Sequence, residues 1–263
     1  MSLPRPGALW AVLVLLASCA ITPLTNRIAV GQEPFVIGVG EGPDGNTDLF
    51  AASAAGGSFV RLTFTRAEER SPRLSPHGSR VAFLRRESEG TITRWTLVAL
   101  ELTSGLERMV PLPPGAGNAE RLGWSPDGST VFLHAAGFFA MDADVAESEL
   151  RPVPESRVSQ ADSAVRENLG SPVAGMVVEC PGGGSCIAGS AGQVTPLGAG
   201  VTEAVRWGPD SVGYFTPSGF EVRPLAGGRS RRPNWSGAPQ RLRSLTYHPG
   251  IQSTLTSGVS GTR

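Results

Sequence analysis

The sequence predicts an all-β fold made of repeated antiparallel units arranged around an axis. A proline-containing turn recurs between apolar stretches, most clearly in LSPHGSRVAFL (74–84) and WSPDGSTVFLH (124–134). A proline followed by Asp or Gly favours a tight turn, and the apolar flanks supply the two strands of a hairpin. Units that recur about every 40 to 50 residues are typical of radial β repeats. The five turn prolines are Pro76, Pro126, Pro181, Pro209 and Pro249.

The composition supports this fold class and excludes several kinds of chemistry. The 263 residues include 34 glycines and 22 prolines, which suits many short strands joined by tight turns. The formal net charge is zero, which argues against nucleic acid as a partner. All 23 basic residues are arginine, so Schiff-base catalysis, a P-loop lysine and a kinase-type lysine are excluded.

Residues 1–18 have the pattern of a signal peptide. Arg5 is the only charge before an unbroken apolar run at 8–17, which is too short to span a bilayer but long enough for a signal-peptide core. The run ends in Leu-Ala-Ser-Cys, which resembles the lipobox of bacterial lipoproteins. This resemblance implies cleavage before Cys19 and a diacylglyceryl lipid on its sulfur, which would bind the protein to a membrane. The alternative is an ordinary signal peptide with an incidental cysteine.

Both ends of the remaining chain are predicted to lie outside the folded domain. Residues 19–34 lack strong periodicity and are expected to form a lipidated tether. The Ser, Thr and Gly-rich residues 257–263 are expected to be a disordered tail. Ala20 follows the lipidated cysteine where Asp would favour the inner membrane of many Gram-negative bacteria. The expected location is therefore the cell envelope, facing the periplasm, with the outer membrane preferred.

Two further cysteines flank the turn Pro-Gly-Gly-Gly-Ser. In an exported protein, Cys180 and Cys186 are expected to form a disulfide bond rather than a metal site or a nucleophile. A zinc site or a cysteine nucleophile would also need a nearby histidine, and the sequence CPGGGSC contains none.

The first repeat carries a resemblance to a known family. DLFAAS (48–53), Gly-Gly (56–57), VRLT (60–63) and SPRLSPHGSRVAFL (71–84) follow one another in this order. The run closely resembles the TolB-type propeller repeat, and the resemblance is specific over 35–135. It implies a β-propeller and a role in protein interaction. His77 and Ser211 stand where the family has the turn Asp and the turn Gly.

The expected architecture is a single β-propeller at 35–256 with five, possibly six, four-stranded blades. Inner strands are predicted near 71–75, 120–125, 173–180, 203–208 and 241–247. The last of these has little chain after it, so residues 35–63 are expected to supply the other strands of its blade. The ring would then be closed by N- and C-terminal strands. Residues 142–171 fit no strand and are predicted to be an insertion on one rim.

An arginine-rich stretch is the candidate binding site. Arginine beside an aromatic ring can hold a phosphate, a carboxylate or a sugar acid, and a solvated rim loop is the alternative. The candidate residues are Arg229, Arg231, Arg232, Trp235, Arg241 and Arg243.

No catalytic residue, cofactor or metal is expected from the other patterns. Residues 40–45 match the dinucleotide pattern GxGxxG, but Pro-Asp-Gly leads directly into a strand, which favours a hairpin turn. His77 and His248 both lie at hairpin turns, and the alternatives for them are a metal site and solvated histidines.

These patterns together predict a non-catalytic, lipid-anchored propeller of the bacterial envelope that binds another envelope protein. The alternative is a propeller that binds a small molecule or acts as a hydrolase or lyase. It would need polar residues that converge on the central channel, around which the blades of a propeller are arranged. A scaffold without a ligand is the third hypothesis.

Overall fold

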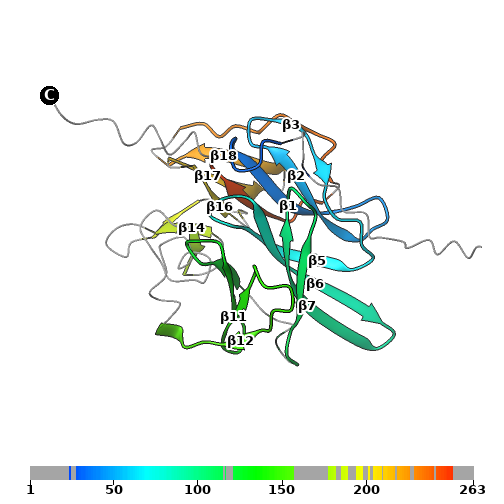
Figure 1. Cartoon of the computed structure of the whole chain (residues 1–263). Helices are drawn as coiled ribbons and strands as arrows, with labels where there is room; N and C mark the ends of the chain where they lie inside the picture. The colour runs from blue at the N-terminus through cyan, green and yellow to red at the C-terminus, as the bar shows by residue number, and fades with distance from the viewer. Residues whose placement is uncertain are drawn as a thin grey trace, which may run out of the picture.

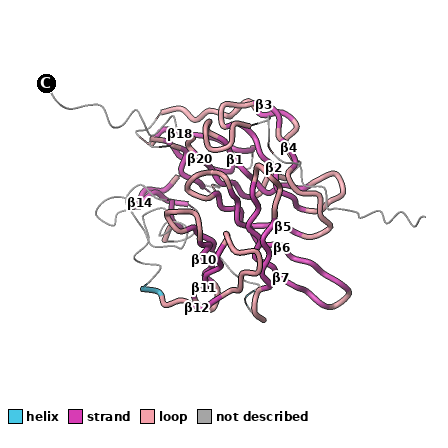
Figure 2. Tube along the Cα trace, viewed as in Figure 1, coloured by secondary structure: helices cyan, strands magenta, loops and turns pink. Residues whose placement is uncertain are grey.

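The structure, a computed structural model, consists of β-sheets arranged around a common axis (Figures 1 and 2). It describes Leu24 and residues 28–114, 116, 121–156, 177–181, 185–188, 194–197, 201, 204–208, 210–216, 218–225, 228–239 and 241–250.

Three sheets have four antiparallel strands. The closing sheet has the order β20 (Ser244–His248), β1 (Phe35–Glu41), β2 (Thr47–Ser53), β4 (Val60–Arg61). The second sheet has the order β5 (Glu68–Leu74), β6 (Arg80–Glu89), β7 (Ile92–Glu101), β8 (Glu107–Pro111). The third sheet has the order β9 (Arg121–Trp124), β10 (Thr130–His134), β11 (Phe138–Asp142), β12 (Arg151–Pro152).

The remaining sheets are smaller. The fourth sheet contains β13 (Val177–Glu179), β14 (Ser185–Ala188) and β15 (Val194–Pro196). The fifth contains β16 (Ala204–Trp207), β17 (Ser211–Thr216) and β18 (Gly219–Pro224). The last is a parallel pair of β3 (Gly57–Ser58) and β19 (Trp235–Ser236).

The sheets are arranged as a β-propeller. Within each larger sheet the strands follow one another in chain order from one edge to the other, apart from β20, which joins β1. The edge strands of successive sheets contact one another: β5 lies beside β20 and β9, and β16 lies beside β20 and β13. Stacking sheets in this way buries the face of each against its neighbours.

The predicted number of complete blades, five or six, is wrong for the described part of the chain, where only three sheets have four strands. The fifth sheet shows one physical reason. After β18, Val222 and Arg231 exchange backbone hydrogen bonds of 2.8 Å as a single isolated bridge. Pro233 lacks an N–H group and cannot extend this ladder, and the chain instead pairs β19 with β3 of the N-terminal region.

The predicted ring closure is present. β1 pairs with β20 from Phe35–His248 to Val39–Ser244, and on its other side with β2. The turn at the join is tight: Gly250 has φ +72°, and a Cβ built there would lie 2.7 Å from the carbonyl oxygen of Gln32. Glycine is therefore required at this position by both conformation and space.

Hydrophobic side chains fill the spaces between sheets. One cluster joins the closing and second sheets, and includes Phe35, Ile37 and Phe83. A second joins the second and third sheets around Trp124, which is 1% exposed. Its indole Nε1 also donates a hydrogen bond of 2.9 Å to the carbonyl of Arg73 on β5. A third cluster places Trp207 between the fifth and closing sheets. Both tryptophans before the hairpin turns thus pack between sheets rather than on the rim.

Two predicted boundaries need correction. The predicted tether at 19–34 includes residues that pack on the fold: Leu24 is fully buried and donates a backbone hydrogen bond of 3.0 Å to Leu102, and Ile28 is 7% exposed. These apolar residues lack the regular spacing of a strand or helix, so the pattern gave no sign of their burial. The predicted insertion at 142–171 contains the strand β12, whose two residues are too few to show an alternation of polar and apolar side chains. Residues 157–171 and the predicted tail at 257–263 lie outside the described residues.

In the part of the chain that the structure describes, no helix has the length and apolar character needed to cross a bilayer.

Truncating Trp124 to Ala should destabilise the fold by about 3–5 kcal/mol, because a large buried ring that joins two sheets leaves a cavity. Urea denaturation followed by far-UV circular dichroism measures this. The matched control is Met109→Ala, since Met109 is 55% exposed and its loss should change stability by less than about 1 kcal/mol. Equal midpoints for the two variants would contradict the packing role of Trp124.

Candidate binding surface

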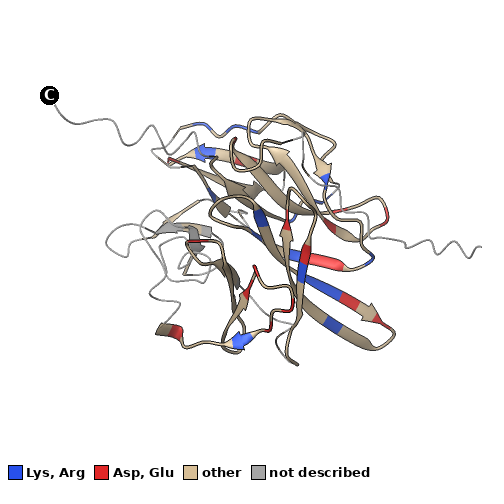
Figure 3. Ribbon diagram, in the orientation of Figure 1, with Lys and Arg blue, Asp and Glu red and all other residues tan. Residues whose placement is uncertain are grey.

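The arginine-rich stretch forms two groups in the structure. Arg229, Arg231 and Arg232 follow β18 at the outer edge of the fifth sheet, whereas Arg241 and Arg243 precede β20. All five side chains are exposed. The stretch therefore lies at the surface as predicted, but it spans the edges of two sheets (Figure 3).

Trp235 does not complete this site. Its indole Nε1 donates a hydrogen bond of 2.9 Å to the carbonyl of Ser53, and its ring stacks on Phe220 with a centroid separation of 5.4 Å. The rings of Trp207 and Phe59 lie beside it, with centroid separations of 6.1 and 5.1 Å. The predicted aromatic partner for a ligand is thus part of the core, where its ring packs on other aromatic rings and its N–H group has a hydrogen-bond acceptor.

Two of the arginines are neutralised within the chain. Arg232 pairs with Glu221 at 3.1 Å and donates to Ser218 at 2.6 Å. A hydrogen bond from Ser230 and the pairing with Arg232 lower the pKa of Glu221. Arg241 lies 3.6 Å from Glu41.

The other three arginines keep their charge available. Among the described residues, no acidic group lies within ion-pair distance of Arg229, Arg231 or Arg243. They are the part of the predicted site that can still attract an anionic group.

A second exposed feature is a projecting hairpin, which the sequence did not single out. β6 and β7 have ten residues each, and residues 87–94 are all exposed, with Ile92 at 56%. β5 pairs with β6 only as far as Arg86, and β8 reaches β7 only as far as Trp95. Beyond these residues the hairpin is a two-stranded ribbon that extends from the body of the molecule (Figure 1). The run of mostly polar residues on both sides of Gly90, RRESEGTITRW (85–95), was its only sequence signal.

The base of the hairpin is stiffened by charged and aromatic side chains. The guanidinium of Arg70 lies 3.9 Å from the centre of the Trp95 ring, and that of Arg86 lies 5.7 Å from it. Arg86 also forms an ion pair with Glu68 on β5. A cation on an aromatic face stabilises such contacts by about 0.5–1 kcal/mol each at exposed sites. The ribbon therefore leaves the sheet in a defined direction.

The titratable side chains buried between the closing and second sheets bind one another. Arg85 contacts Glu69 at 2.9 Å and forms a two-pronged contact with Glu107 at 2.7 and 2.8 Å. Thr63 donates to the second oxygen of Glu69 at 2.5 Å. Glu69 is 1% exposed, and burial raises its pKa to about 7, although Arg85 acts in the opposite direction.

A second carboxylate extends this network. Asp48 is fully buried, pairs with Arg61 and accepts a backbone hydrogen bond of 3.2 Å from Thr65. Burial raises its pKa against the effect of Arg61. Arg61 also lies 3.2 Å from Asp44 in the turn between β1 and β2. The contacts join β2, β4 and β5, so the geometry gives these charges a role in holding two sheets together.

The two histidines considered as metal ligands, His77 and His248, differ in environment. His248 is buried; its Nε2 lies 2.9 Å from the carbonyl of Pro76, and its Nδ1 accepts a hydrogen bond of 3.1 Å from Gly250. Burial lowers the pKa of His248. His77 is exposed. Within the described ranges, no three His, Cys, Asp or Glu side chains are grouped to hold a metal ion.

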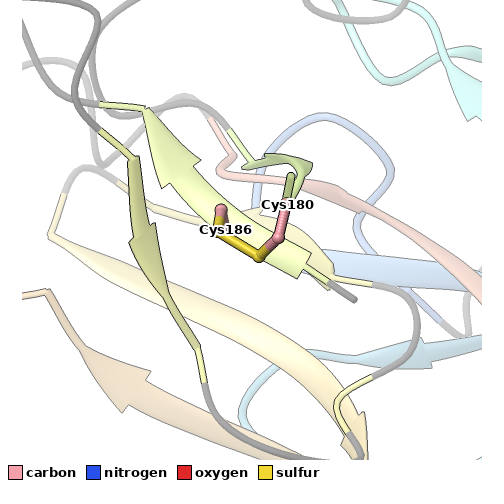
Figure 4. The surroundings of a disulfide bond; sticks show 2 residues. All are labelled: Cys180 and Cys186. Carbon is pink, nitrogen blue, oxygen red and sulfur yellow. A yellow bond between two sulfur atoms is a disulfide. The ribbon is translucent and has the colours of Figure 1, made fainter. Parts of the chain in front are cut away.

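Cys180 and Cys186 form the disulfide bond that the sequence favoured, with their Cα atoms 5.1 Å apart (Figure 4). The bond joins the end of β13 to β14 across their turn. Cys19 lies outside the described residues.

No protein-family model and no curated protein matches the chain. Among solved structures, the crystal structure of TolB from Acinetobacter baumannii is 14% identical, with a TM-score of 0.39, and the match covers 75% of this chain and 52% of that chain. The crystal structure of the eukaryotic initiation factor is 12% identical, with a TM-score of 0.28, and the match covers 80% and 54%. The chain spans about half the length of each, and likenesses at these TM-scores do not extend to function.

Replacing Glu69 by Gln should flatten the pH dependence of stability. Because the pKa of Glu69 rises from 4.5 to about 7 on folding, the folded state holds a proton that the unfolded state has released between these values. The contribution is full below pH 4.5 and is lost as pH rises through 7. Urea midpoints of the wild type should therefore fall over this range more than those of Glu69→Gln. Glu89→Gln, at an exposed position, is the control and should keep the wild-type slope. Parallel curves for all three proteins would contradict the role of Glu69.

Proposed function

We propose that the protein is a non-catalytic, lipid-anchored β-propeller of the bacterial cell envelope that binds another envelope protein. The observation that carries the proposal is the projecting β6–β7 hairpin. Ordering residues 87–94 costs conformational entropy, while their exposed side chains bury little apolar area within the chain. Contact with a partner would supply the missing burial, and an exposed ribbon edge can also pair with an extended segment.

The exposed arginines support the same function. Arg229, Arg231 and Arg243 would steer a partner with acidic side chains, because exposed charges mainly raise association rates and select among partners. Arginine also binds carboxylates through two parallel hydrogen bonds.

The enzymatic alternative has less support. Its strongest candidates are the buried carboxylates Asp48 and Glu69, since buried groups with a raised pKa are common in active sites. Both carboxylates are bound within the fold, by Arg61 and by Arg85 with Thr63. These contacts favour a structural role for them.

The anchor is proposed from the N-terminal pattern. The charged start, the apolar run and the Leu-Ala-Ser-Cys sequence support a diacylglyceryl lipid on Cys19, and Ala20 supports the outer membrane. Acyl chains contribute membrane affinity of roughly 0.8 kcal/mol per buried CH₂ group.

Replacing Cys19 by Ser should leave the propeller folded but release it from membranes, or leave its signal peptide uncleaved, because the sulfur is the point of lipid attachment. Membrane fractionation with mass spectrometry of the N-terminus measures both outcomes. Processed Cys19→Ser protein that still requires detergent for extraction would overturn the lipid anchor.

Shortening the hairpin should remove the partner without unfolding the protein. Residues 87–94 would be replaced by Asn-Gly, a two-residue turn suited to joining Arg86 and Trp95. Proteins captured from solubilised membranes by the full-length lipoprotein should be lost with this variant and kept with the exposed control Met109→Ser. A circular dichroism melt confirms folding. If the shortened protein captures the same proteins in the same amounts, the hairpin is not the binding element.

A further inference from the structure

The two ends of the strands form two distinct rims. We define the anchor rim by the turns 75–79, 102–106 and 125–129 and the loop 143–150, which follow β5, β7, β9 and β11. The opposite, distal rim contains the turns 42–46, 90–91 and 135–137. Neighbouring turns of the anchor rim are in contact: Arg80 pairs with Asp144 at 2.6 Å and donates to the carbonyl of Gly128 at 3.4 Å.

The described N-terminal segment lies along the anchor rim. Leu24 donates its backbone N–H to the carbonyl of Leu102 at 3.0 Å, and the N–H of Leu102 donates to Ser79 at 2.9 Å. Further along, a Cβ built on Gly31 would lie 2.8 Å from the carbonyl oxygen of His77. Because Leu24 is fully buried in the core, this is a fixed point of the fold.

The chain between the proposed lipid and this fixed point is short. Five residue steps separate Cys19 from Leu24, so their Cα atoms lie at most about 18 Å apart even if the chain is fully extended. The ten-residue strands β6 and β7 carry the hairpin tip about 33 Å along their length away from the anchor rim. The connection from Cys19 to Leu24 is therefore shorter than β6 and β7, the strands that separate the hairpin tip from the anchor rim.

We infer that the lipid holds the propeller in one orientation, with the anchor rim beside the bilayer and the hairpin tip directed away from it. The inference rests on the proposed lipidation of Cys19. Leu106 and Val145 on the anchor rim are 46% and 47% exposed and can contact the interfacial region. The anchor rim thus contacts the surface of the bilayer into which the acyl chains insert. The hairpin tip remains accessible to a protein partner.

Energy transfer to the membrane tests the orientation. Full-length lipidated protein in phosphatidylcholine vesicles would carry one thiol-linked donor dye, in a Ser104→Cys variant on the anchor rim or a Thr91→Cys variant at the hairpin tip. Both positions are exposed, and Cys180 and Cys186 are oxidised, so the dye reacts with the new cysteine. The acceptor is a dye-labelled lipid.

Since the two positions are about 30 Å apart along the strands, we expect transfer from residue 104 to exceed that from residue 91 by about twofold or more. Equal transfer, or stronger transfer from residue 91, would overturn the orientation. Insertion of a twelve-residue Gly-Ser linker after Ala20 should reduce the difference, because a flexible linker lets the domain rotate. An unchanged difference would show that something other than the short connection from Cys19 to Leu24 orients the domain.

Vesicle flotation separates this inference from the proposed function. Wild-type protein that does not float with the vesicles would overturn the lipid anchor, and the orientation with it. Protein that floats but shows equal transfer from both positions keeps the anchor and overturns only the orientation. Cys19→Ser protein should not float.

Discussion

The pairing of β1 with β20 is the constraint on which the rest of the fold depends. It joins residues about two hundred positions apart, such as Phe35 and His248, and the loop-closure entropy of this long connection is offset only once the sheets between them have packed. The backbone is too crowded at this pairing to admit side chains at two glycines. Gly250 admits no side chain at its φ of +72°, and a Cβ on Gly38 would lie 2.5 Å from Leu242. Small residues at the join thus allow the chain ends to approach closely enough to complete the closing sheet.

The junction between the closing and second sheets contains a network of buried charges. Ion pairs buried between sheets have a high desolvation cost, which is offset only when each charge has well-placed partners. Arg85 meets this condition through Glu69 and Glu107, and Glu69 receives a further hydrogen bond from Thr63. These contacts connect β5, β6 and β8 within the second sheet, and the hydrogen bond from Thr63 connects Glu69 to the chain that follows β4 of the closing sheet. The network also makes the junction between the closing and second sheets sensitive to pH, because burial has raised the pKa of its central carboxyl group.

The candidate surface was predicted only in part from the sequence. The arginines at 229–243 were correctly expected at the surface because charged side chains rarely find enough partners to be buried. Trp235 was wrongly grouped with them, because proximity in sequence says nothing about whether a ring points to solvent or to Phe220. The projecting hairpin was not predicted, because the strand length that makes it project is visible only against the shorter strands around it. Polar residues beside Gly90 are compatible with an ordinary turn.

Local chemistry in the sequence determined the hairpins. Proline and glycine turns, such as those at 75–79 and 125–129, restrict the backbone within four or five residues, and the apolar flanks select strands. The ring closure followed from the same pattern, since the last inner strand lacked neighbours after it in the chain. Tertiary structure alone decided which outer strands exist. The isolated bridge between Val222 and Arg231 is followed by Pro233, and Trp235 and Ser236 pair with Gly57 and Ser58 from the N-terminal part of the chain. The physical reason is that a turn is specified by its own residues, whereas a strand edge accepts any backbone that the packing of distant side chains brings within hydrogen-bonding distance.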